Sequence, residues 1–481
     1  MMIEKRQFYI NGAWVDPVAG TDFPVFNPAT EEPFATISLG GAADAEAAIA
    51  AARAAFTSWS MTTPAERGAH LKAILEVYQS RASDMAEAIS TEMGAPIDMA
   101  LTDQAGSGPS HLKAFIRALD GFEWVRPLRP GVDGQDLVFE AAGVAALITP
   151  WNWPMNQVVL KVGAALAAGC TMVLKPSEIA PMSSIVFAEI MHEAGIPAGV
   201  FNMVNGDGAG VGSILSSHPE IDVVSFTGST RAGILISKAA ADTIKTVSLE
   251  LGGKSPNLVF ADTDVEAAVA RGARFCFNNT GQSCNSATRM LVEREVYDQA
   301  VEVAAATAEA TIVDLPSKQG GHIGPLVSEA QFSKVQTLIQ AGIDEGARLV
   351  AGGTGRPEGL NRGWFVRPTV FADTTGDMTI MKEEIFGPVL AMMPFDSEEE
   401  AIEIANDTPY GLAAYIQTGN PERARRVAAQ LRAGMIQVNG AGRPSGSPFG
   451  GYKQSGVGRE GGVWGIEEFL EMKTISGIVD E

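Results

Sequence analysis

Cysteine and histidine are scarce in this chain, with three cysteines and five histidines among 481 residues. The cysteine count is odd, no Cys-x-x-Cys pair occurs, and the opening stretch MMIEKRQFYING lacks the apolar core of a signal peptide, so a disulfide framework is not indicated. Every histidine lies more than thirty residues from Cys284, so a local Cys/His zinc cluster cannot assemble. We therefore expect no metal site, assign the histidines no role, and expect the protein to stay in the cytoplasm.

A long unbroken hydrophobic run is also missing. The longest uncharged stretch, residues 141–160, has about the length of a membrane span, but prolines and amides interrupt it, namely Pro150, Asn152, Pro154, Asn156 and Gln157. The net charge of −22 would repel polyanions, which argues against nucleic acid and anionic membrane surfaces as partners. We expect a globular protein without a transmembrane helix.

The residues that are present suit large packed cores. With 46% hydrophobic residues, the chain has material for two or three domains. Residues 42–56 and 64–89 follow helical periodicity, and FYINGAWVDP indicates two short strands joined by an Asn-Gly turn. After residue 142, the segments GVAALIT, TMVLKP, VFNMVNG and IDVVSFTG alternate with stretches of helical length, which is typical of a parallel sheet with helices on both faces.

A second α/β segment extends from residue 251 to about 440, with helices expected at 264–278, 293–309 and 328–346. Two strand-like segments, PLRPGVDGQDLVFEAAG and KTISGIVDE, belong to neither core. They could pair with each other or with another subunit.

The stretch NTGQSCNSATR places Cys284 among small polar residues. Buried structural cysteines usually pack against aliphatic neighbours, which Cys284 lacks in the sequence. Two interpretations remain open at this point: a nucleophile, or an ordinary polar-loop cysteine. Cys170 and Cys276 have apolar or small neighbours and are expected to pack in a core.

Two other segments hold a chemical group at a strand end. TPWNWP places Asn152 between rigid residues, which suits either an aimed amide donor or a buried turn asparagine. In TVSLELGG, strand alternation puts Ser248 and Glu250 on the face opposite the apolar residues. Glu250 is therefore a candidate general base, or a strand-end charge in water.

Three further segments suggest a nucleotide site without requiring one. LKPSE places Lys175 and Glu178 at a strand end, where they could bind sugar hydroxyls or remain solvated charges. FTGSTRAG suggests a helix capped by Ser229, whose N-terminus could hold a phosphate. GDGAGVG does not fit G-x-G-x-x-G, because position 211 is Val and position 213 is Ser, so an ordinary Gly-rich turn is expected.

The order and combination of these segments are far more specific than any one of them. PWNWP, KPSE, FTGSTRAG, LELGGKSP, NTGQSC, EEIFGPV and PFGGYKQSGVGRE, with FYINGAW, FNPAT and GPLVS, resemble the successive motifs of the NAD(P)-dependent aldehyde dehydrogenase superfamily over nearly the whole chain. The resemblance implies an α/β fold with a Rossmann-like parallel-sheet coenzyme domain (1–122 and 142–250), an α/β catalytic domain (251–440), a small β oligomerisation arm (123–141 and 466–481) and a loop that closes the active site (441–465).

The resemblance also implies roles for single residues. Cys284 matches the catalytic thiol, Glu250 the base, and Asn152 the oxyanion-hole amide, while Lys161 and Glu460 match a pair that relays protons. The positions that match coenzyme contacts are Thr149, Pro150, Trp151, Lys175, Ser177, Glu178, Gly208, Phe226, Gly228, Ser229, Gly233, Leu251, Glu384 and Phe386. NAD is favoured over NADP, because a carboxylate at position 178 would repel a 2′-phosphate.

The implied reaction is the oxidation of an aldehyde to a carboxylic acid with NAD. Cys284, taken as a thiol with an ordinary pKa of about 8.5, forms a thiohemiacetal and then a thioester, which water activated by Glu250 hydrolyses. Small residues around the thiol are expected to leave space for the substrate, namely Gly281, Ser283, Asn285 and Ser286. Two alternatives stay open: a CoA-acylating dehydrogenase, and a non-catalytic scaffold with this fold.

By motif position, the residues expected to line the aldehyde tunnel are Trp153, Gln157, Leu160, Ser283, Asn285 and Phe449. Gln157 and Leu160 occupy places where many relatives have bulkier groups, which indicates a medium or long aldehyde. This could be a semialdehyde whose far carboxylate meets Arg443, although Arg443 is equally compatible with a solvated loop charge. The expected partners are a small-molecule aldehyde and further copies of the chain, as a dimer or tetramer.

Overall fold

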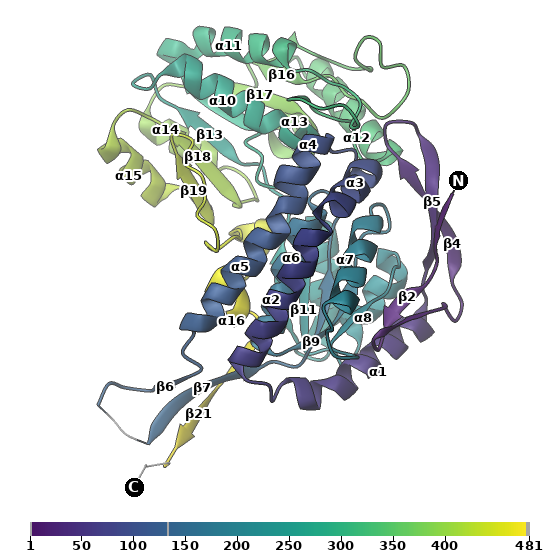
Figure 1. The fold of residues 1–481 in the computed structure, drawn as a ribbon. Helices are drawn as coiled ribbons and strands as arrows, with labels where there is room; N and C mark the ends of the chain where they lie inside the picture. The colour runs from purple at the N-terminus through teal and green to yellow at the C-terminus, as the bar shows by residue number, and fades with distance from the viewer. Residues whose placement is uncertain (1, 132–133, 478–481) are drawn as a thin grey trace.

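The computed structural model describes residues 2–131 and 134–477. It has two α/β lobes, and a β-stranded arm projects from the lower lobe (Figure 1). Each lobe is built on its own large sheet, of eight strands in the lower lobe and seven in the upper. The α/β fold class predicted from the sequence is confirmed.

The lower lobe contains the sheet ordered β20-β12-β11-β8-β9-β10-β2-β3. Its five central strands are parallel: β8 (Val144–Ile148), β9 (Thr171–Lys175), β10 (Phe201–Met203), β11 (Val223–Thr227) and β12 (Thr246–Glu250). Its edges are antiparallel: β2 (Phe8–Ile10), β3 (Ala13–Val15) and β20 (Gly456–Val457). All residues of β8, β9 and β11 are buried, since helices cover both faces, and this explains their continuous apolar sequences.

Two groups of helices cover this sheet. One face carries α2 (Pro64–Ser80), α3 (Ala82–Met93), α5 (Gly106–Gly121), α6 (Pro154–Ala168) and α7 (Met182–Glu193). The other carries α1 (Ala42–Trp59), α8 (Ser213–Ser217) and α9 (Thr230–Ala241). The helical stretch expected over 64–89 is interrupted at Arg81, which leaves helical geometry and pairs with Asp84, Glu189 and Glu193.

The upper lobe contains the sheet ordered β15-β16-β17-β14-β13-β18-β19, in which only β15 is antiparallel to its neighbour. The strands are β13 (Pro256–Val259), β14 (Arg289–Glu293), β15 (Arg348–Ala351), β16 (Thr369–Ala372), β17 (Val389–Phe395), β18 (Ala413–Gln417) and β19 (Met435–Val438). The three predicted helices are observed as α10 (Val265–Phe277), α11 (Tyr297–Ala310) and α12 (Glu329–Asp344). Asp264 and Ser328 cap α10 and α12 with their side chains, as the sequence boundaries anticipate.

Shorter elements connect these units. An N-terminal sheet is formed by β1 (Ile3–Lys5), β4 (Thr21–Asn27) and β5 (Glu32–Leu39). The short helices are α4 (Ile97–Met99), η1 (Ala100–Ala105), η2 (Gly208–Gly212), η3 (Asn278–Gly281), η4 (Arg294–Val296), α13 (Thr379–Lys382), α14 (Glu398–Asn406), α15 (Pro421–Gln430), η5 (Lys453–Ser455) and α16 (Gly462–Glu467). The expected Asn-Gly turn is present, with φ of 52° at Asn11 and 79° at Gly12.

The projecting arm consists of β6 (Val125–Pro127), β7 (Gln135–Ala141) and β21 (Leu470–Ser476). β7 pairs with both of the others in antiparallel fashion, so the two strand-like segments do pair with each other. Ile466 and Phe469, which the sequence grouped with the arm, are instead buried in the core of the lower lobe. Residues 132–133 and 478–481 of the expected arm lie outside the described residues.

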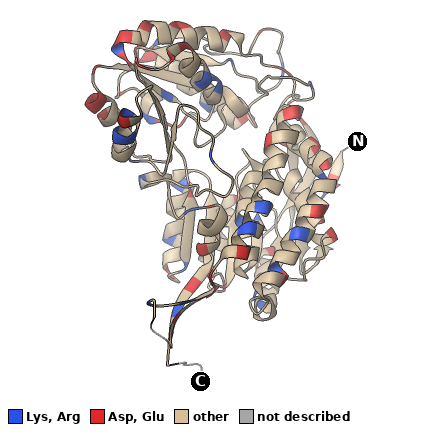
Figure 2. Ribbon diagram, turned by 60° about the vertical axis from the view of Figure 1, so that its left-hand side comes forward, with Lys and Arg blue, Asp and Glu red and all other residues tan. Residues whose placement is uncertain are grey.

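Charged side chains are interspersed on both lobes, with no broad basic face in the view of Figure 2. Among the described residues, no helix combines the length and the apolar character that crossing a membrane requires.

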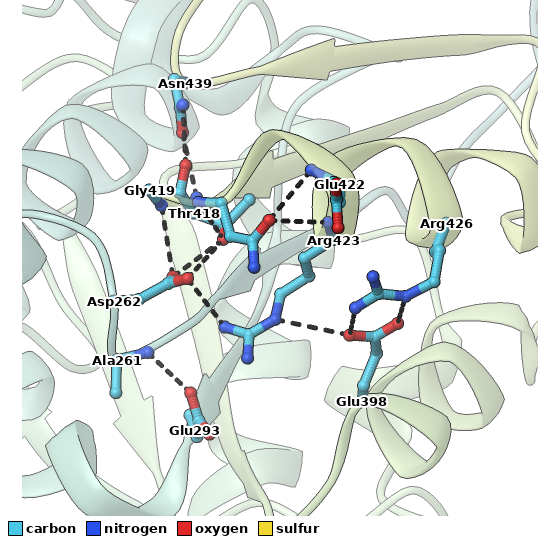
Figure 3. A network of polar contacts seen from close by, with 11 residues as sticks. Ala261, Asp262, Glu293, Glu398, Thr418, Gly419, Glu422, Arg423, Arg426 and Asn439 are labelled. Carbon is cyan, nitrogen blue, oxygen red and sulfur yellow. Dashed lines mark hydrogen bonds and ion pairs between the residues drawn. The ribbon is translucent and has the colours of Figure 1, made fainter.

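A polar network at the carboxyl end of β13 ties the upper sheet to α15 (Figure 3). Asp262 accepts hydrogen bonds from Thr418 Oγ1 at 2.8 and 3.0 Å and from the N–H of Gly419 at 3.2 Å, and it pairs with Arg423 at 3.0 Å. The Arg423 guanidinium also lies over the Phe260 ring, 4.7 Å from its centroid. Most of these polar groups have partners within the network, and Arg423 also pairs with Glu398 at 3.4 Å, so we interpret the network as structural.

We expect Asp262→Ala to lower the free energy of unfolding by about 1–2 kcal/mol, because three donors lose their shared acceptor. Chemical denaturation monitored by circular dichroism measures this loss. Asp120→Ala is the matched control, since the Asp120 side chain is exposed and makes no hydrogen bond within the described residues. Equal stability of the two variants would contradict a structural role for the network.

Candidate active site

Three groups that are distant in the sequence line one cavity of about 230 Å³. Asn152 follows β8, Glu250 ends β12, and Cys284 follows the η3 turn of the upper lobe. The cavity therefore lies where the carboxyl ends of the lower sheet meet the upper lobe. Its remaining lining residues are Pro150, Trp151, Thr227, Gly228, Ser229, Leu251, Gly252, Gln331, Lys334, Glu384 and Phe386.

The loop that carries Cys284 is held in an unusual backbone conformation. Asn279 and Thr280 have φ values of 51° and 56°, which bulky residues rarely adopt. Asn279 Nδ2 donates to the carbonyl of Asn152 at 2.9 Å, and Thr280 Oγ1 donates to the carbonyl of Gly324 at 3.0 Å. These bonds fix the loop against both lobes and offset the backbone strain.

Two of the small residues around the thiol do not leave space for substrate, contrary to the sequence prediction. Gly281 has φ of 70°, and a Cβ there would come 2.0 Å from the carbonyl oxygen of Gly387. Ser286 is buried and donates to the carbonyl of Cys276 at 3.2 Å. Both residues are small because neighbouring backbone packs against them.

Asn152 presents its amide beside the thiol. Its Nδ2 donates to the carbonyl of Gln282 at 2.9 Å, which aims the amide and leaves its second N–H for another acceptor. The backbone N–H groups of Cys284 and Asn285 lie close enough to the sulfur to oppose the rise in its pKa. Several donors thus point at the region where an oxygen would develop negative charge.

The thiol does not have the ordinary pKa expected from the sequence. Burial, and then the carboxyl groups of Glu384 and Glu250, raise the pKa of Cys284 well above its usual range. A thiolate here would be poorly solvated and close to two acids. In the absence of a ligand, Cys284 is therefore protonated at neutral pH.

Glu250 is buried rather than solvated, with 2% of its surface exposed. Neither carboxyl oxygen has a hydrogen-bond partner in residues 2–131 or 134–477. Burial, and then the charge of Glu460, raise the pKa of Glu250 well above its usual value, while Lys161 and Arg459 oppose the shift. The interpretation of Glu250 as a strand-end charge in water is therefore wrong. Glu250 faces the cavity as an unpaired carboxyl group.

Lys161 and Glu460 lie behind the base as a buried ion pair, with 1% and 6% of their side chains exposed. Lys161 Nζ also donates to Thr227 Oγ1 at 2.8 Å. The expected pairing of these two residues is observed, and it joins α6 to the loop after β20.

One group of the expected coenzyme residues surrounds the N-terminus of α9. Ser229 caps this helix by accepting a hydrogen bond from the N–H of Ala232, and a Cβ at Gly233 would come 2.8 Å from Leu251. Phe226 packs under Gly228 in the same turn. The small residues let the helix end approach β12 closely, which leaves its free N–H groups beside the cavity.

Other expected coenzyme residues lie across this cavity. The rings of Trp151 and Phe386 meet edge to face with centroids 5.5 Å apart, and Pro150 lines the wall beside them. Glu384 accepts a hydrogen bond from the N–H of Gly253 at 3.0 Å. Burial raises the pKa of Glu384.

A second group lies around the carboxyl end of β9, outside the residues that line the cavity. Lys175 Nζ donates to the carbonyl of Gly206 at 2.6 Å and lies 3.4 Å from Glu178. The remaining members are Thr149, Ser177 and Gly208. Gly208 opens the π-helical turn η2, so the expected ordinary Gly-rich turn is instead helical and is capped by the side chain of Asp207.

Two of the expected tunnel residues, Ser283 and Asn285, flank Cys284 in the chain and contact aromatic side chains. Trp153 Nε1 donates to Ser283 Oγ at 2.8 Å, and the carbonyl of Asn285 accepts from Tyr415 at 2.8 Å. The Arg443 guanidinium lies over the Phe449 ring, 4.7 Å from its centroid.

Two residues of α6 complete this set. Leu160 is 3.9 Å from the position of a Cβ on Gly461, and Gln157 is buried with Oε1 unpartnered among the described residues.

Several residues at the site were missed by sequence reasoning. Gln104, from the π-helix η1, donates to the carbonyl of Asn152 at 3.1 Å, and His111 bonds Asn156 at 2.7 Å beside the tunnel. Burial lowers the pKa of His111. The others are Asn279, Gln282, Gln331, Lys334 and Tyr415. No local pattern marks Gln104 or His111, whereas Gln331 and Lys334 share one face of a predicted helix.

A thiol, an amide and a buried carboxyl group thus line one cavity at the carboxyl edge of a parallel sheet, the place where such sheets bind ligands. Residues 14–475 match the model of the aldehyde dehydrogenase family. The chain is 50% identical over 477 residues, covering 99% of both chains, to a Pseudomonas protein named 3-succinoylsemialdehyde-pyridine dehydrogenase.

Solved structures agree with this match. An aldehyde dehydrogenase from Bartonella henselae has 57% identity and a TM-score of 0.98, with 99% of this chain and 100% of that one covered. A mutant of aldehyde dehydrogenase C from Pseudomonas syringae, in complex with NAD+ and octanal, has 47% identity and a TM-score of 0.96, with 98% and 96% covered. The chain belongs to the aldehyde dehydrogenase family and is an oxidoreductase that converts aldehydes to acids.

Proposed function

We propose that this enzyme oxidises its aldehyde with NAD through a covalent intermediate on Cys284, which water activated by Glu250 hydrolyses. The observation that supports this most directly is the convergence of Cys284, Asn152 and Glu250 on one cavity. Once its thiol proton has passed to water, Cys284 attacks the aldehyde carbon as a thiolate, and the resulting alkoxide receives hydrogen bonds from the Asn152 amide and the backbone N–H of Cys284. Loss of hydride from that carbon leaves a thioester on Cys284.

The chain offers a fitting place for NAD. The N-terminus of α9, with Ser229 and Gly228, would hold the pyrophosphate, and Glu384 would hold the ribose next to the nicotinamide ring. A Cβ at Gly252 would come 2.5 Å from Glu384, so only glycine keeps this wall open. Bound NAD+ supplies the hydride acceptor and a positive charge beside the thiol. Lys175 and Glu178 would hold the adenosine ribose, and Glu178 favours NAD over NADP.

We propose a medium or long aldehyde, including a semialdehyde whose far anionic end binds Arg443. Arg443 lies in an exposed loop, but its guanidinium turns toward Phe449, and it pairs with no carboxylate in the described part of the chain. A semialdehyde is named for the Pseudomonas relative and octanal for the Pseudomonas syringae complex. Gln157 adds an unpartnered amide oxygen to the same tunnel.

We expect Arg443→Gln to reduce kcat/KM about 10- to 100-fold for a semialdehyde bearing a carboxylate, because a charge-assisted hydrogen bond is lost. Kinetics across aldehydes of varied length and charge, with NAD and NADP in parallel, measure this effect. An unbranched aldehyde of equal length should be nearly unaffected, and Arg425→Gln, on the exposed face of α15, is the matched control. Acetaldehyde as the best substrate, or equal losses for both aldehydes, would argue against this substrate class.

We further propose that the lower lobe binds the coenzyme, the upper lobe supplies the nucleophile, and the arm joins subunits into a homodimer or homotetramer. Apolar side chains are exposed on α9, at Ile234 and Leu235, and on the arm, at Val125 and Met472. Exposed apolar groups on the projecting arm and on a surface helix suit contacts between copies. Sedimentation equilibrium that finds only a monomer would exclude the assembly.

A further inference from the structure

Each hydrolysis step leaves a proton on Glu250, and the structure around Glu250 restricts its escape. The Lys161–Glu460 pair is almost as deeply buried as Glu250 itself. That pair can accept and return a proton, but it makes little contact with solvent. A group with partial exposure is needed to connect the cluster with bulk water.

Glu468 is such a group. It is half-buried, follows α16, and accepts a hydrogen bond from the backbone N–H of Arg459 at 2.9 Å, while its Oε2 and Ser248 Oγ both lie beside Gly458. Ser248 lies two residues before Glu250 on β12, so both side chains point to the same face of the strand. A hydroxyl group can both accept and donate a proton, so Ser248 suits a position between two carboxyl groups.

Two glycines keep these groups close together. A Cβ at Gly458 would come 2.5 Å from Glu468 Oε2 and 2.6 Å from Ser248 Oγ. A Cβ at Gly450 would come 2.6 Å from Glu250 Oε1 and 2.7 Å from the carbonyl oxygen of Gly458. The two carboxyl groups therefore both lie close to the short segment that contains Gly458.

The charges that face this route come from several elements. Glu250 interacts electrostatically with Glu460, Lys161, Arg459 and Glu468. Cys284 and Arg443 also interact with it electrostatically. Burial raises the pKa of Glu468. Both carboxyl groups thus hold a proton more readily than free glutamate does, which favours exchange between them.

We propose that Glu468, oriented by Ser248 and Arg459, is the outlet through which the proton taken up by Glu250 reaches solvent. The inference rests on the proposed role of Glu250 in hydrolysis. Water adds its hydroxyl group to the acyl carbon, its proton goes to Glu250, and the C–S bond breaks to return Cys284 as thiolate. The proton then passes to Glu468 and on to water, and Glu250 becomes a carboxylate again.

The test uses the full-length enzyme with Glu468→Gln, which keeps an acceptor for Arg459 but cannot carry the proton. The acyl-enzyme is formed from aldehyde and NAD, and its decay is followed by quenching and intact-protein mass spectrometry. We expect acylation to be unchanged and hydrolysis to slow about tenfold, with the rate restored in proportion to added imidazole buffer. Glu467→Gln, on the exposed neighbouring residue, should match the wild type in both steps.

A second variant distinguishes the loss of an ionisable group at position 468 from a folding defect. Glu468→Asp retains an ionisable group and should recover hydrolysis without imidazole, whereas Ser248→Ala should resemble Glu468→Gln. Three outcomes would each contradict the proposed role of Glu468 in proton release. They are hydrolysis by Glu468→Gln at the wild-type rate, a loss of hydrolysis that imidazole does not restore, and an equal loss of acylation. Hydrolysis that survives in Glu250→Gln would instead refute the proposed function and is read in the same assay.

Discussion

Cys284→Ala is expected to lose aldehyde-dependent NADH formation by about 10⁴-fold or more, since removal of a nucleophile leaves only binding and electrostatic effects. The proposed thioester forms on this sulfur, and without it the donors around it have no alkoxide to stabilise. Steady-state absorbance at the NADH band measures the loss, and mass spectrometry should find no acyl-enzyme.

The same substitution at Cys276 supplies the matched control. Cys276 is buried in the upper lobe, where burial raises its pKa to about 12, and its sulfur donates to the carbonyl of Val389. Cys276→Ala should keep nearly full activity after a small loss of stability. NADH formation by Cys284→Ala at a rate close to that of Cys276→Ala would contradict the role of Cys284 as nucleophile, whereas no NADH formation by the wild type would support the scaffold alternative.

The central strands were predictable because strands buried on both faces have continuous apolar sequences. β8, β9 and β11 are continuous apolar runs that end in turn residues, so their pattern requires no knowledge of the rest of the chain. The edge strands lack such a long continuous apolar run. β2 and β3 could still be predicted from the Asn-Gly turn that joins them, but β20 has only two residues and acquires strand geometry from its pairing with β12.

The site shows the same division. Cys284, Asn152 and Glu250 stand in motifs whose order could be recognised, but the groups that position them could not. Gln104 reaches the Asn152 backbone from a π-helix that carries no sequence signal. The protonation of the Cys284 thiol depends on groups that the fold brings around it from distant parts of the chain. Its raised pKa therefore follows from tertiary structure alone.

Glu250→Gln is expected to form the acyl-enzyme and then stop, with hydrolysis slowed by about 10²–10⁴-fold. Glutamine has nearly the shape of glutamic acid but cannot accept the proton of the attacking water. Rapid mixing should show a burst of NADH close to one per active site, followed by very slow turnover. Intact-protein mass spectrometry should find the acyl group on the enzyme.

The direction of the pH dependence follows from the raised pKa of Glu250. Only the carboxylate acts as a base, so wild-type hydrolysis should rise with pH until Glu250 is ionised. A raised pKa also means that folding favours the protonated form, and this stabilisation is lost as pH rises through the folded-state value. Glutamine does not ionise, so the variant should be at least as stable as the wild type at neutral pH.

This comparison of stabilities separates a chemical defect from a folding defect. The hydrolysis assay distinguishes hydrolysis of the thioester by water from transfer of its acyl group to a thiol. Coenzyme A added to the wild type should leave the rate unchanged if water is the acceptor. A Glu250→Gln variant that turns over at the wild-type rate, or whose acyl group leaves rapidly only when coenzyme A is present, would favour transfer to a thiol. The unpaired Glu250 carboxyl group in the cavity favours water, because thioester exchange with a thiolate needs no base at that position.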